Sequence, residues 1–305
     1  MTAVVMTDGL TKRYGRVTAV QDLSLEVLEG DLFGFLGPNG SGKSTTLRML
    51  LGLVYPTAGQ VEVLGRPIPK EAGVVLPDIG SLIEGPAFYP HVSGPGNLAL
   101  IAAQSGTSRR HRRELVGDAL ERVGLVGVGR LPYRAYSSGM KQRLGLAAAI
   151  LRKRRLLILD EPTNGLDPAG TREMRDLFVE LVATGTTILL SSHLLSEIEL
   201  VCTRAAIVHN GRLMAQAAVG ELLAPTQRVL ISTPDVDATM REIGSMRTPW
   251  IVERRADGIV VHLDGFDPSD LNSRLVRAGV RVRGLSPERP RLEEVFLRLT
   301  KGGGR

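Results

Sequence analysis

The fold of this chain is decided by one glycine-rich stretch, Gly37-Pro38-Asn39-Gly40-Ser41-Gly42-Lys43-Ser44. The stretch matches the pattern G-x-x-x-x-G-K-[ST], and it stands between an apolar segment, Leu32–Leu36, and a segment of helical pattern that begins at Ser44. A glycine-rich turn without a ligand is the alternative. It does not explain why the motif lies directly between a strand pattern and a helix pattern. We therefore predict a loop whose backbone N–H groups surround a nucleotide phosphate at a helix N-terminus.

The side chains of this loop add specific contacts to those of the backbone. Lys43 can reach the β- and γ-phosphates of a nucleoside triphosphate, and the hydroxyl of Ser44 can ligate Mg²⁺. The candidate nucleotide-binding residues of the loop are Gly37, Pro38, Asn39, Gly40, Ser41, Gly42, Lys43, Ser44 and Thr45.

A second segment places two acids after an apolar run. Leu156–Leu159 is wholly apolar and is followed by Asp160 and Glu161. This pattern is typical of a strand that is buried on both faces and carries its chemistry at the carboxyl end. We expect Asp160 to hold Mg²⁺, through water, and Glu161 to act as the general base for an attacking water.

His193 follows a third apolar segment, 186–192. It stands at a strand's carboxyl end, where ligands of open α/β sheets bind. A structural histidine is the alternative. We expect a catalytic one that contacts the γ-phosphate.

Composition limits the class of protein. The chain has 305 residues, 43% hydrophobic and 23% charged, which indicates a folded chain of one large or two modest domains. The net charge of +6 permits a nucleic-acid or anionic-lipid partner without favouring one. The single cysteine, Cys202, excludes an intramolecular disulfide.

Two domains are expected along the chain, at 3–224 and 225–305. In the first, apolar strands at 156–159, 186–190 and 205–208 alternate with helices at 171–183 and 194–201, which predicts a mostly parallel sheet covered on both faces. One helical region is expected from Asn97 to about Val123. The second domain is predicted as a small α+β, ferredoxin-like unit. Its strands are expected at 228–232, 250–255, 258–263 and 280–284, with a turn at 256–257 and helices at 236–246, 268–278 and 292–300.

A further motif narrows the class. The segment Tyr136-Ser137-Ser138-Gly139-Met140-Lys141-Gln142-Arg143 resembles the signature motif of ATP-binding-cassette (ABC) ATPases, usually written Leu-Ser-Gly-Gly-Gln. The family's order of motifs is phosphate loop, signature, Walker B acids, D-loop and switch histidine. This chain has all five in that order over 3–224, with the D-loop at Gly165-Leu166-Asp167.

The resemblance implies a fold, ligands and a partner. The fold is an α/β P-loop cassette, with a mostly parallel sheet, an antiparallel β subdomain and a helical subdomain. The ligands are ATP and Mg²⁺, with Tyr14 placed to stack on adenine. Two copies are expected to form a head-to-tail homodimer that sandwiches each ATP between one phosphate loop and the other copy's Ser137 and Gly139. Asp167 is expected at the same nucleotide site.

Three departures from the family pattern stand out. Ser138 replaces the first signature glycine, and Met140 replaces its glutamine. The glutamine expected between Gly80 and Phe88 is absent, and Glu84 is its nearest substitute. A glutamate can accept from metal-bound water and so respond to Mg²⁺, but it cannot donate an amide N–H.

Within the family, the segments 136–143 and 82–90 look most like ATPase subunits of ABC-2-type exporters of drugs, antibiotics and peptides. The final segment, 291–300, resembles the end of the accessory domain of such subunits. No targeting or spanning segment is visible, so separate membrane-spanning permease subunits are implied. We expect a cytoplasmic protein, peripheral to the inner face of the cell membrane, with no nucleic-acid partner. The regions 84–97 and 97–123 are candidates for the docking surface.

Two other functions remain to be weighed. A soluble cassette ATPase of translation or DNA maintenance typically has two cassettes or long coiled coils, whereas this chain has one phosphate loop and no sustained heptads. A module that binds nucleotide without turnover does not need both Glu161 and His193.

The exported substrate is not evident from the sequence. Arg152–Arg155 is expected to be an exposed helix end.

Overall fold

The structure is a computed structural model that describes residues 2–83, 88–104, 106–224, 228–246, 250, 252–255, 258–263, 265–288 and 290–301. By its Cα positions the chain divides into two compact units, Met1–Val219 with Leu299–Arg305, and Gly220–Arg298. Each unit has a hydrophobic core of its own. Glu84 and the turn at 256–257 lie outside the described residues.

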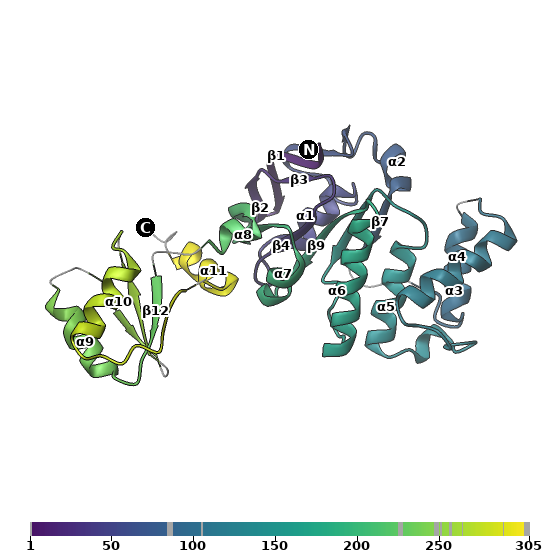
Figure 1. Ribbon diagram of the computed structural model, residues 1–305. Coiled ribbons are helices and arrows are strands. Elements are labelled where there is room, and N and C mark those ends of the chain that lie inside the picture. The colour runs from purple at the N-terminus through teal and green to yellow at the C-terminus, as the bar shows by residue number, and fades with distance from the viewer. Residues whose placement is uncertain are drawn as a thin grey trace. The chain divides into compact units, whose positions relative to one another are not determined.

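The first unit (Figure 1) contains most of the elements. Its strands are β1 (Ala3–Tyr14), β2 (Val17–Leu23), β3 (Glu26–Leu28), β4 (Leu32–Leu36), β5 (Ala58–Val63), β6 (Arg66–Pro67), β7 (Ile79–Leu82), β8 (Leu156–Asp160), β9 (Thr187–Ser192), β10 (Arg204–His209) and β11 (Arg212–Ala218). Its helices are α1 (Lys43–Leu50), α2 (Ala72–Val75), α3 (Gly94–Gln104), α4 (Arg109–Arg122), α5 (Ser138–Ala149), α6 (Pro168–Ala183) and α7 (Leu195–Val201), with short 3-10 helices at Leu76–Asp78 and Tyr133–Ala135. Helix α8 (Val219–Leu222) lies where the two units divide.

A six-stranded sheet positions the chemistry of this unit. Its strand order is β11-β10-β4-β9-β8-β7, and every pair is parallel except the edge pair of β10 and β11. The central strands β4, β8 and β9 are buried on both faces, apart from Asp160 at the end of β8. Because these strands are parallel, the residues that follow them meet at one edge of the sheet. The predicted mostly parallel sheet is confirmed.

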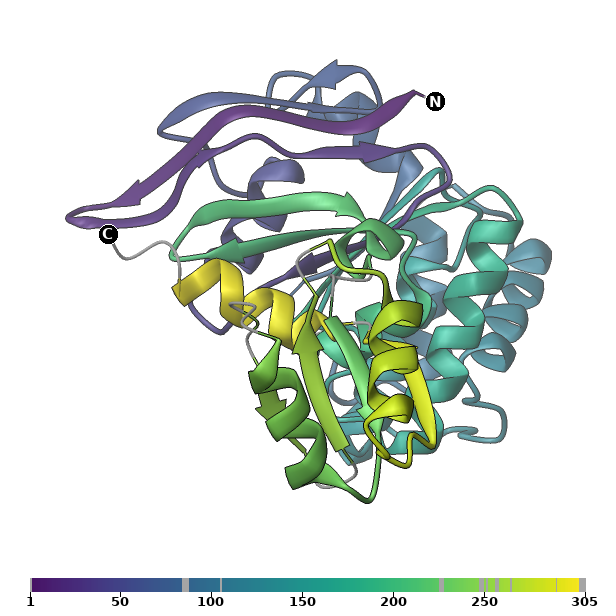
Figure 2. The same ribbon diagram turned by 60° about the vertical axis from the view of Figure 1, so that its left-hand side comes forward.

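A second sheet is antiparallel and holds α1 from the other side. Its order is β2-β1-β5-β6, with β3 also paired to β1, and Figure 2 shows this layer in purple and blue along one side of the unit. Leu47 and Leu50 of α1 share one buried cluster with Val5 and Val63 of this layer and with Phe35 of β4. Full burial of such a side chain contributes roughly 1.5–3 kcal/mol. The helix that starts at the phosphate loop is therefore anchored on two sides.

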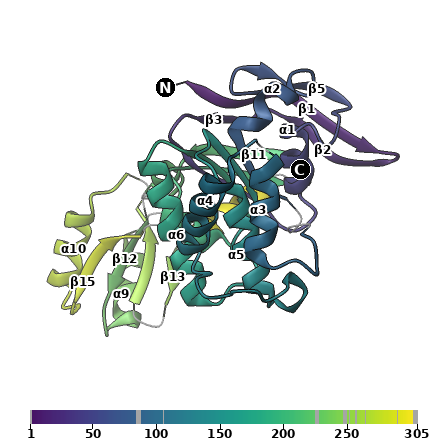
Figure 3. The same cartoon turned by 90° about the vertical axis from the view of Figure 1, so that its right-hand side faces the viewer.

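The predicted helical region from Asn97 to Val123 is confirmed and consists of two helices, α3 and α4. Figure 3 shows α3 and α4 side by side. The connection between them includes Gly106, whose φ is 72°, and Ser108, whose hydroxyl accepts from the His111 N–H and caps α4. A glycine in the left-handed conformation interrupts the helical backbone. The N-cap serine then starts the next helix.

The second unit is an α+β domain with a ferredoxin-like strand order. Its elements are β12 (Arg228–Ser232), α9 (Val236–Ser245), β13 (Val252–Arg254), β14 (Gly258–His262), α10 (Pro268–Arg277), β15 (Gly284–Pro287) and α11 (Leu292–Lys301), which belongs to this unit as far as Arg298. The sheet order is β13-β14-β12-β15, all antiparallel. Leu271 and Leu275 of α10 and Ile243 of α9 join the buried face of β12 and β14. The predicted small α+β unit is confirmed.

The last predicted strand was misplaced. It was expected at 280–284, but β15 begins at Gly284. Val280 is buried although it is not in a strand, because it packs into the core of the second unit after the end of α10. The apolar residue at this position reflects its packing in the core and does not indicate a strand.

None of the helices in the described part of the chain is both long and apolar enough to span a bilayer.

Candidate functional site

The phosphate loop joins the end of β4 to the start of α1, as its motif predicts. Gly42 precedes α1 with a φ of 98°, and a Cβ at this position would collide with the carbonyl oxygen of Ala19. A Cβ at Gly37 would collide with the carbonyl of Val208. These two positions therefore require glycine, one for its dihedral angle and both for close backbone approach.

Lys43 is held inside the loop. Its side chain is only 6% exposed, and its Nζ donates to the carbonyl oxygens of Gly37 at 2.7 Å and Pro38 at 3.3 Å. The same Nζ lies 3.5 Å from Oε1 of Glu161. The buried ammonium is thus compensated by a carboxylate and two carbonyls, all in the region where a phosphate would bring further negative charge.

Glu161 joins the phosphate loop to the switch histidine. Its Oε2 lies 2.7 Å from Nδ1 of His193, while its other oxygen faces Lys43. The two residues follow β8 and β9, which are neighbours in the sheet. Glu161 lines the nucleotide cavity, so its carboxylate can accept a proton from a water that binds there.

One cavity collects most of the predicted nucleotide contacts. Its volume is about 360 Å³, and its lining residues are Tyr14, Ala19, Asn39, Gly40, Gly42, Lys43, Ser44, Thr45 and Glu161. Tyr14 is 46% exposed, and the Nζ of Lys12 lies 5.0 Å from the centre of its ring. Tyr14 is therefore available to stack on a base at the same cavity as the loop.

Asp160 and Ser44 are the described candidates for Mg²⁺. Asp160 ends β8, and its Oδ1 accepts from the Ser191 hydroxyl at 2.5 Å. Among the described residues there is no group of three or more acid, histidine or cysteine ligands that could hold a metal. One carboxylate and one hydroxyl suit Mg²⁺, which is usually bound through few protein ligands together with waters and substrate phosphates. Glu84, the third predicted ligand, lies outside the described residues.

Three predicted nucleotide contacts lie elsewhere in the chain. Ser137 caps α5, where its Oγ accepts from the Met140 N–H at 3.2 Å, and Gly139 lies in the first turn of that helix. Asp167 caps α6, where its Oδ1 accepts from the Gly170 N–H at 2.9 Å. None of the three is among the residues that line the cavity. Two helix N-termini thus present donors that this copy's own cavity does not use.

Sequence reasoning missed two residues that contact this site. Ser191 bonds both Asp160 and the Glu161 N–H, and Gln142 donates from α5 to the Glu161 carbonyl oxygen at 3.0 Å. Ser191 lies near the end of β9, two residues before His193, and that spacing is a usable signal in the sequence. The contact of Gln142 depends on how α5 packs and has no local signal.

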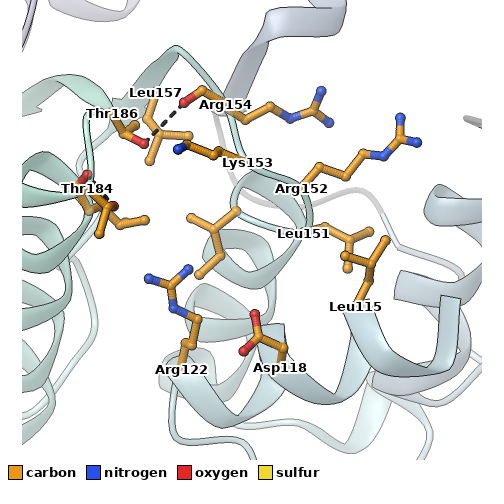
Figure 4. Close-up of a pocket in the computed structure, with 12 residues that line it drawn as sticks. Leu115, Asp118, Arg122, Leu151, Arg152, Lys153, Arg154, Leu157, Thr184 and Thr186 are labelled. Carbon is orange, nitrogen blue, oxygen red and sulfur yellow. Dashed lines mark hydrogen bonds between the residues drawn. The ribbon is translucent and has the colours of Figure 1, made fainter. Parts of the chain in front are cut away.

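A second cavity lies at the opposite end of β8 (Figure 4). Its volume is about 270 Å³, and Arg122, Arg152, Lys153 and Arg154 are among its lining residues. The prediction of an exposed helix end at 152–155 is wrong for Arg152 and Arg154, which are half-buried, and Arg154 donates to the carbonyl of Pro77. Burial lowers the pKa of Arg154, and the neighbouring charge of Arg152 lowers it further.

Comparison with known proteins places these motifs in one family. Residues 20–164 match the family model described as ABC transporter. The chain is 38% identical to the bacitracin transport ATP-binding protein of Bacillus licheniformis, over 99% of each chain. It is 36% identical to the Nod factor export ATP-binding protein I of Paraburkholderia xenovorans, over 98% of this chain and 97% of that one. In fold it is similar to a bacterial ABC transporter cassette whose structure is dimeric, with a TM-score of 0.66, 23% identity, and coverage of 70% of this chain and 98% of the other.

Proposed function

The chain belongs to the ABC transporter ATP-binding family, and on that premise we propose that it hydrolyses ATP to drive export through separate membrane-spanning permease subunits. The relatives support this proposal because they match over nearly the whole chain and are described by transport of bacitracin and export of Nod factor. We propose a substrate of that general kind, an antibiotic, drug or peptide-like molecule. The permease chains would select it.

The phosphate loop is proposed to bind the triphosphate of ATP. The N–H groups at the start of α1 face the β-phosphate, where the helix dipole favours negative charge. Lys43 exchanges its present carbonyl partners for oxygens of the β- and γ-phosphates. Tyr14, which lines the same cavity, stacks on adenine.

Glu161 is proposed as the general base for hydrolysis. It takes a proton from a water that attacks the γ-phosphorus, while the bond from that phosphorus to the β,γ-bridging oxygen breaks and ADP leaves with the electron pair. His193 holds the carboxylate at 2.7 Å and can contact the γ-phosphate. Mg²⁺, when bound by Ser44 and Asp160, neutralises charge on the phosphates. We propose Glu84 as a further residue near that ion.

The position of two helix N-termini outside the cavity supports a head-to-tail homodimer. Because Ser137, Gly139 and Asp167 do not line this copy's cavity, we propose that they contact the nucleotide bound to a second copy. Each site then combines one copy's phosphate loop with the other copy's signature helix, and neither copy is complete alone. The similar cassette is described as dimeric, which supports a dimer of this chain.

The cellular location and the roles of the two domains follow from the same proposal. We propose a cytoplasmic protein at the inner face of the cell membrane, with 3–224 as the ATP-binding domain and 225–305 as an accessory domain. No nucleic acid is needed as a partner. The relatives do not favour a soluble factor of translation or DNA maintenance, since both are described by transport.

The observation that carries the proposal is the position of Glu161 between Lys43 and His193 at the edge of the cavity. We expect Glu161→Gln to bind ATP and to accumulate as an ATP-bound dimer without turnover. ATP hydrolysis by the purified variant and its elution as a dimer in size-exclusion chromatography with ATP measure this. Wild-type turnover in the variant would refute the assigned base.

A further inference from the structure

The backbone of Glu161 is held in an unfavourable conformation. Its φ is 48°, in the left-handed region that non-glycine residues rarely adopt. A residue stays in such a conformation only when its surroundings determine it, and these conformations concentrate at functional sites. The direction of the Glu161 side chain therefore depends on the contacts that fix its two peptide groups.

Three contacts fix these peptide groups. The Glu161 N–H donates to Oγ of Ser191 at 3.0 Å, and the Glu161 carbonyl oxygen accepts from the Asn164 N–H at 3.1 Å. The same carbonyl oxygen accepts from Nε2 of Gln142 at 3.0 Å. Asn164 belongs to the turn that Glu161 itself starts, so it moves with that turn. Ser191 and Gln142 come from β9 and α5, and they tie the turn to the rest of the unit.

Gln142 is anchored on a helix that is itself well fixed. The next residue, Arg143, donates to the carbonyl oxygen of Val123 at 2.7 Å and pairs with Glu173 of α6 at 2.8 Å. Leu144 and Leu146 of the same helix are fully buried. A donor on such a helix can hold a partner at a defined place because little of its own freedom remains to be lost.

From these contacts we infer that Gln142 is a positioning residue for ATP hydrolysis, acting through its hydrogen bond to the Glu161 carbonyl oxygen. The bond keeps the turn oriented so that the Glu161 carboxylate meets His193 and Lys43. This inference rests on the proposed function. Helix α5 would then have two roles. Its Gln142 holds the Glu161 turn, and its N-terminus is the proposed contact for the ATP of the second copy. Engagement of that ATP and alignment of Glu161 are then linked through one helix.

Gln142→Met tests the inference, because methionine has a similar length and helix preference but no donor. We expect kcat for ATP hydrolysis to fall about tenfold or more, since small displacements of a catalytic group have effects of this size. The KM for ATP and the thermal midpoint are expected to stay within about twofold and a few degrees of wild type. Gln142→Glu keeps the shape and places a carboxylate oxygen against the carbonyl, so its kcat should fall at least as far.

Gln216→Met is the matched control. The side chain of Gln216 also makes one hydrogen bond to a backbone group, accepting from the Glu26 N–H at 3.2 Å, and it lines no part of the nucleotide cavity. We expect its kcat and KM to equal those of wild type. A purely structural role for Gln142 would give a lower thermal midpoint with an unchanged kcat in the remaining folded protein.

The outcomes separate this inference from the proposed function. If wild type hydrolyses ATP, Glu161→Gln does not, and Gln142→Met keeps the wild-type kcat, then the inference alone is overturned. It is also overturned if the loss in Gln142→Met lies wholly in KM or follows loss of folded protein. If wild type has no ATPase activity, or Glu161→Gln keeps it, then the proposed function itself fails.

Discussion

At the scale of single residues, the proposed chemistry depends on a few side chains that are far apart in sequence and meet beside the phosphate loop. Lys43, Glu161 and His193 form a continuous chain of contacts. The sequence motifs were sufficient to predict these three residues, because each follows a buried strand of a parallel sheet. Gln142 could not be predicted, since its contact with Glu161 depends on how α5 packs against the sheet.

Loss of the Lys43 ammonium should weaken ATP binding. Lys43→Ala removes charge-assisted contacts to the phosphates and leaves the Glu161 carboxylate without its cationic neighbour, so we expect the Kd for ATP to rise about tenfold or more. Titration with a fluorescent ATP analogue measures this, with Arg48→Ala in the same helix as a control. An unchanged affinity in Lys43→Ala would contradict the assignment of the loop.

Cys202 should be unreactive in the folded protein. It is 8% exposed, and burial, with a further contribution from the charge of Asp31, raises the pKa of its thiol. Because the thiolate is the reactive form, a raised pKa leaves almost none of it at pH 8. We expect iodoacetamide to label Cys202 slowly in the native protein and rapidly in denaturant, as followed by mass spectrometry. Equal rates in both states would contradict its burial.

At the scale of elements, the sequence pattern predicted the buried strands β8 and β9 but missed β7, which is also largely buried, and the edge strand β11. β8 and β9 lie inside the sheet around buried runs of leucine and isoleucine, and both were predicted within about two residues. β11 was not predicted, because it is an edge strand whose residues are half-buried or exposed and mix Arg212, Gln216 and several alanines. The break between α3 and α4 was missed for a related reason, since one glycine interrupts an otherwise helical pattern.

One ion pair of the second unit should make its stability depend on pH. Asp235 precedes α9, and its carboxylate accepts from Nε and Nη2 of Arg281 at 2.9 and 2.6 Å. These bonds lower the pKa of Asp235 from 3.8 to about 2. An acid whose pKa is lower in the folded state than in the unfolded state stabilises the fold at pH values above its unfolded pKa. This contribution is lost as the pH falls through the folded-state pKa.

Asp235→Asn should therefore unfold at lower urea than wild type at pH 7, and the two midpoints should converge as the pH falls from 3.8 toward about 2. Trp250 is the only tryptophan of the chain and contacts Phe266 in the second unit, so its fluorescence follows this unit. Asp176→Asn, on α6 of the first unit, is the control. If the urea midpoints of Asp235→Asn and wild type differed by the same amount at every pH, the role of the ion pair would be contradicted.

At the scale of the whole molecule, the chain is one half of the proposed ATPase. Its own cavity contains the phosphate loop, Tyr14 and Glu161, while Ser137, Gly139 and Asp167 stand at helix N-termini outside that cavity. The order of motifs along the chain predicted which residues belong to the nucleotide site. The resemblance to the family also predicted that Ser137 and Gly139 act at the second copy's site, and the structure adds that they do not line this copy's cavity.

Mixing two inactive variants tests the central claim most directly. Lys43→Ala removes the phosphate-loop contact, and Ser137→Asp keeps an N-cap residue for α5 while placing a carboxylate against the second copy's γ-phosphate. Each variant alone should lack ATPase activity. In a mixed dimer one site carries both defects and the other carries none, so the mixture should recover about a quarter of wild-type activity if copies pair at random. No recovery in mixed dimers that are shown to form would contradict a site shared between two copies.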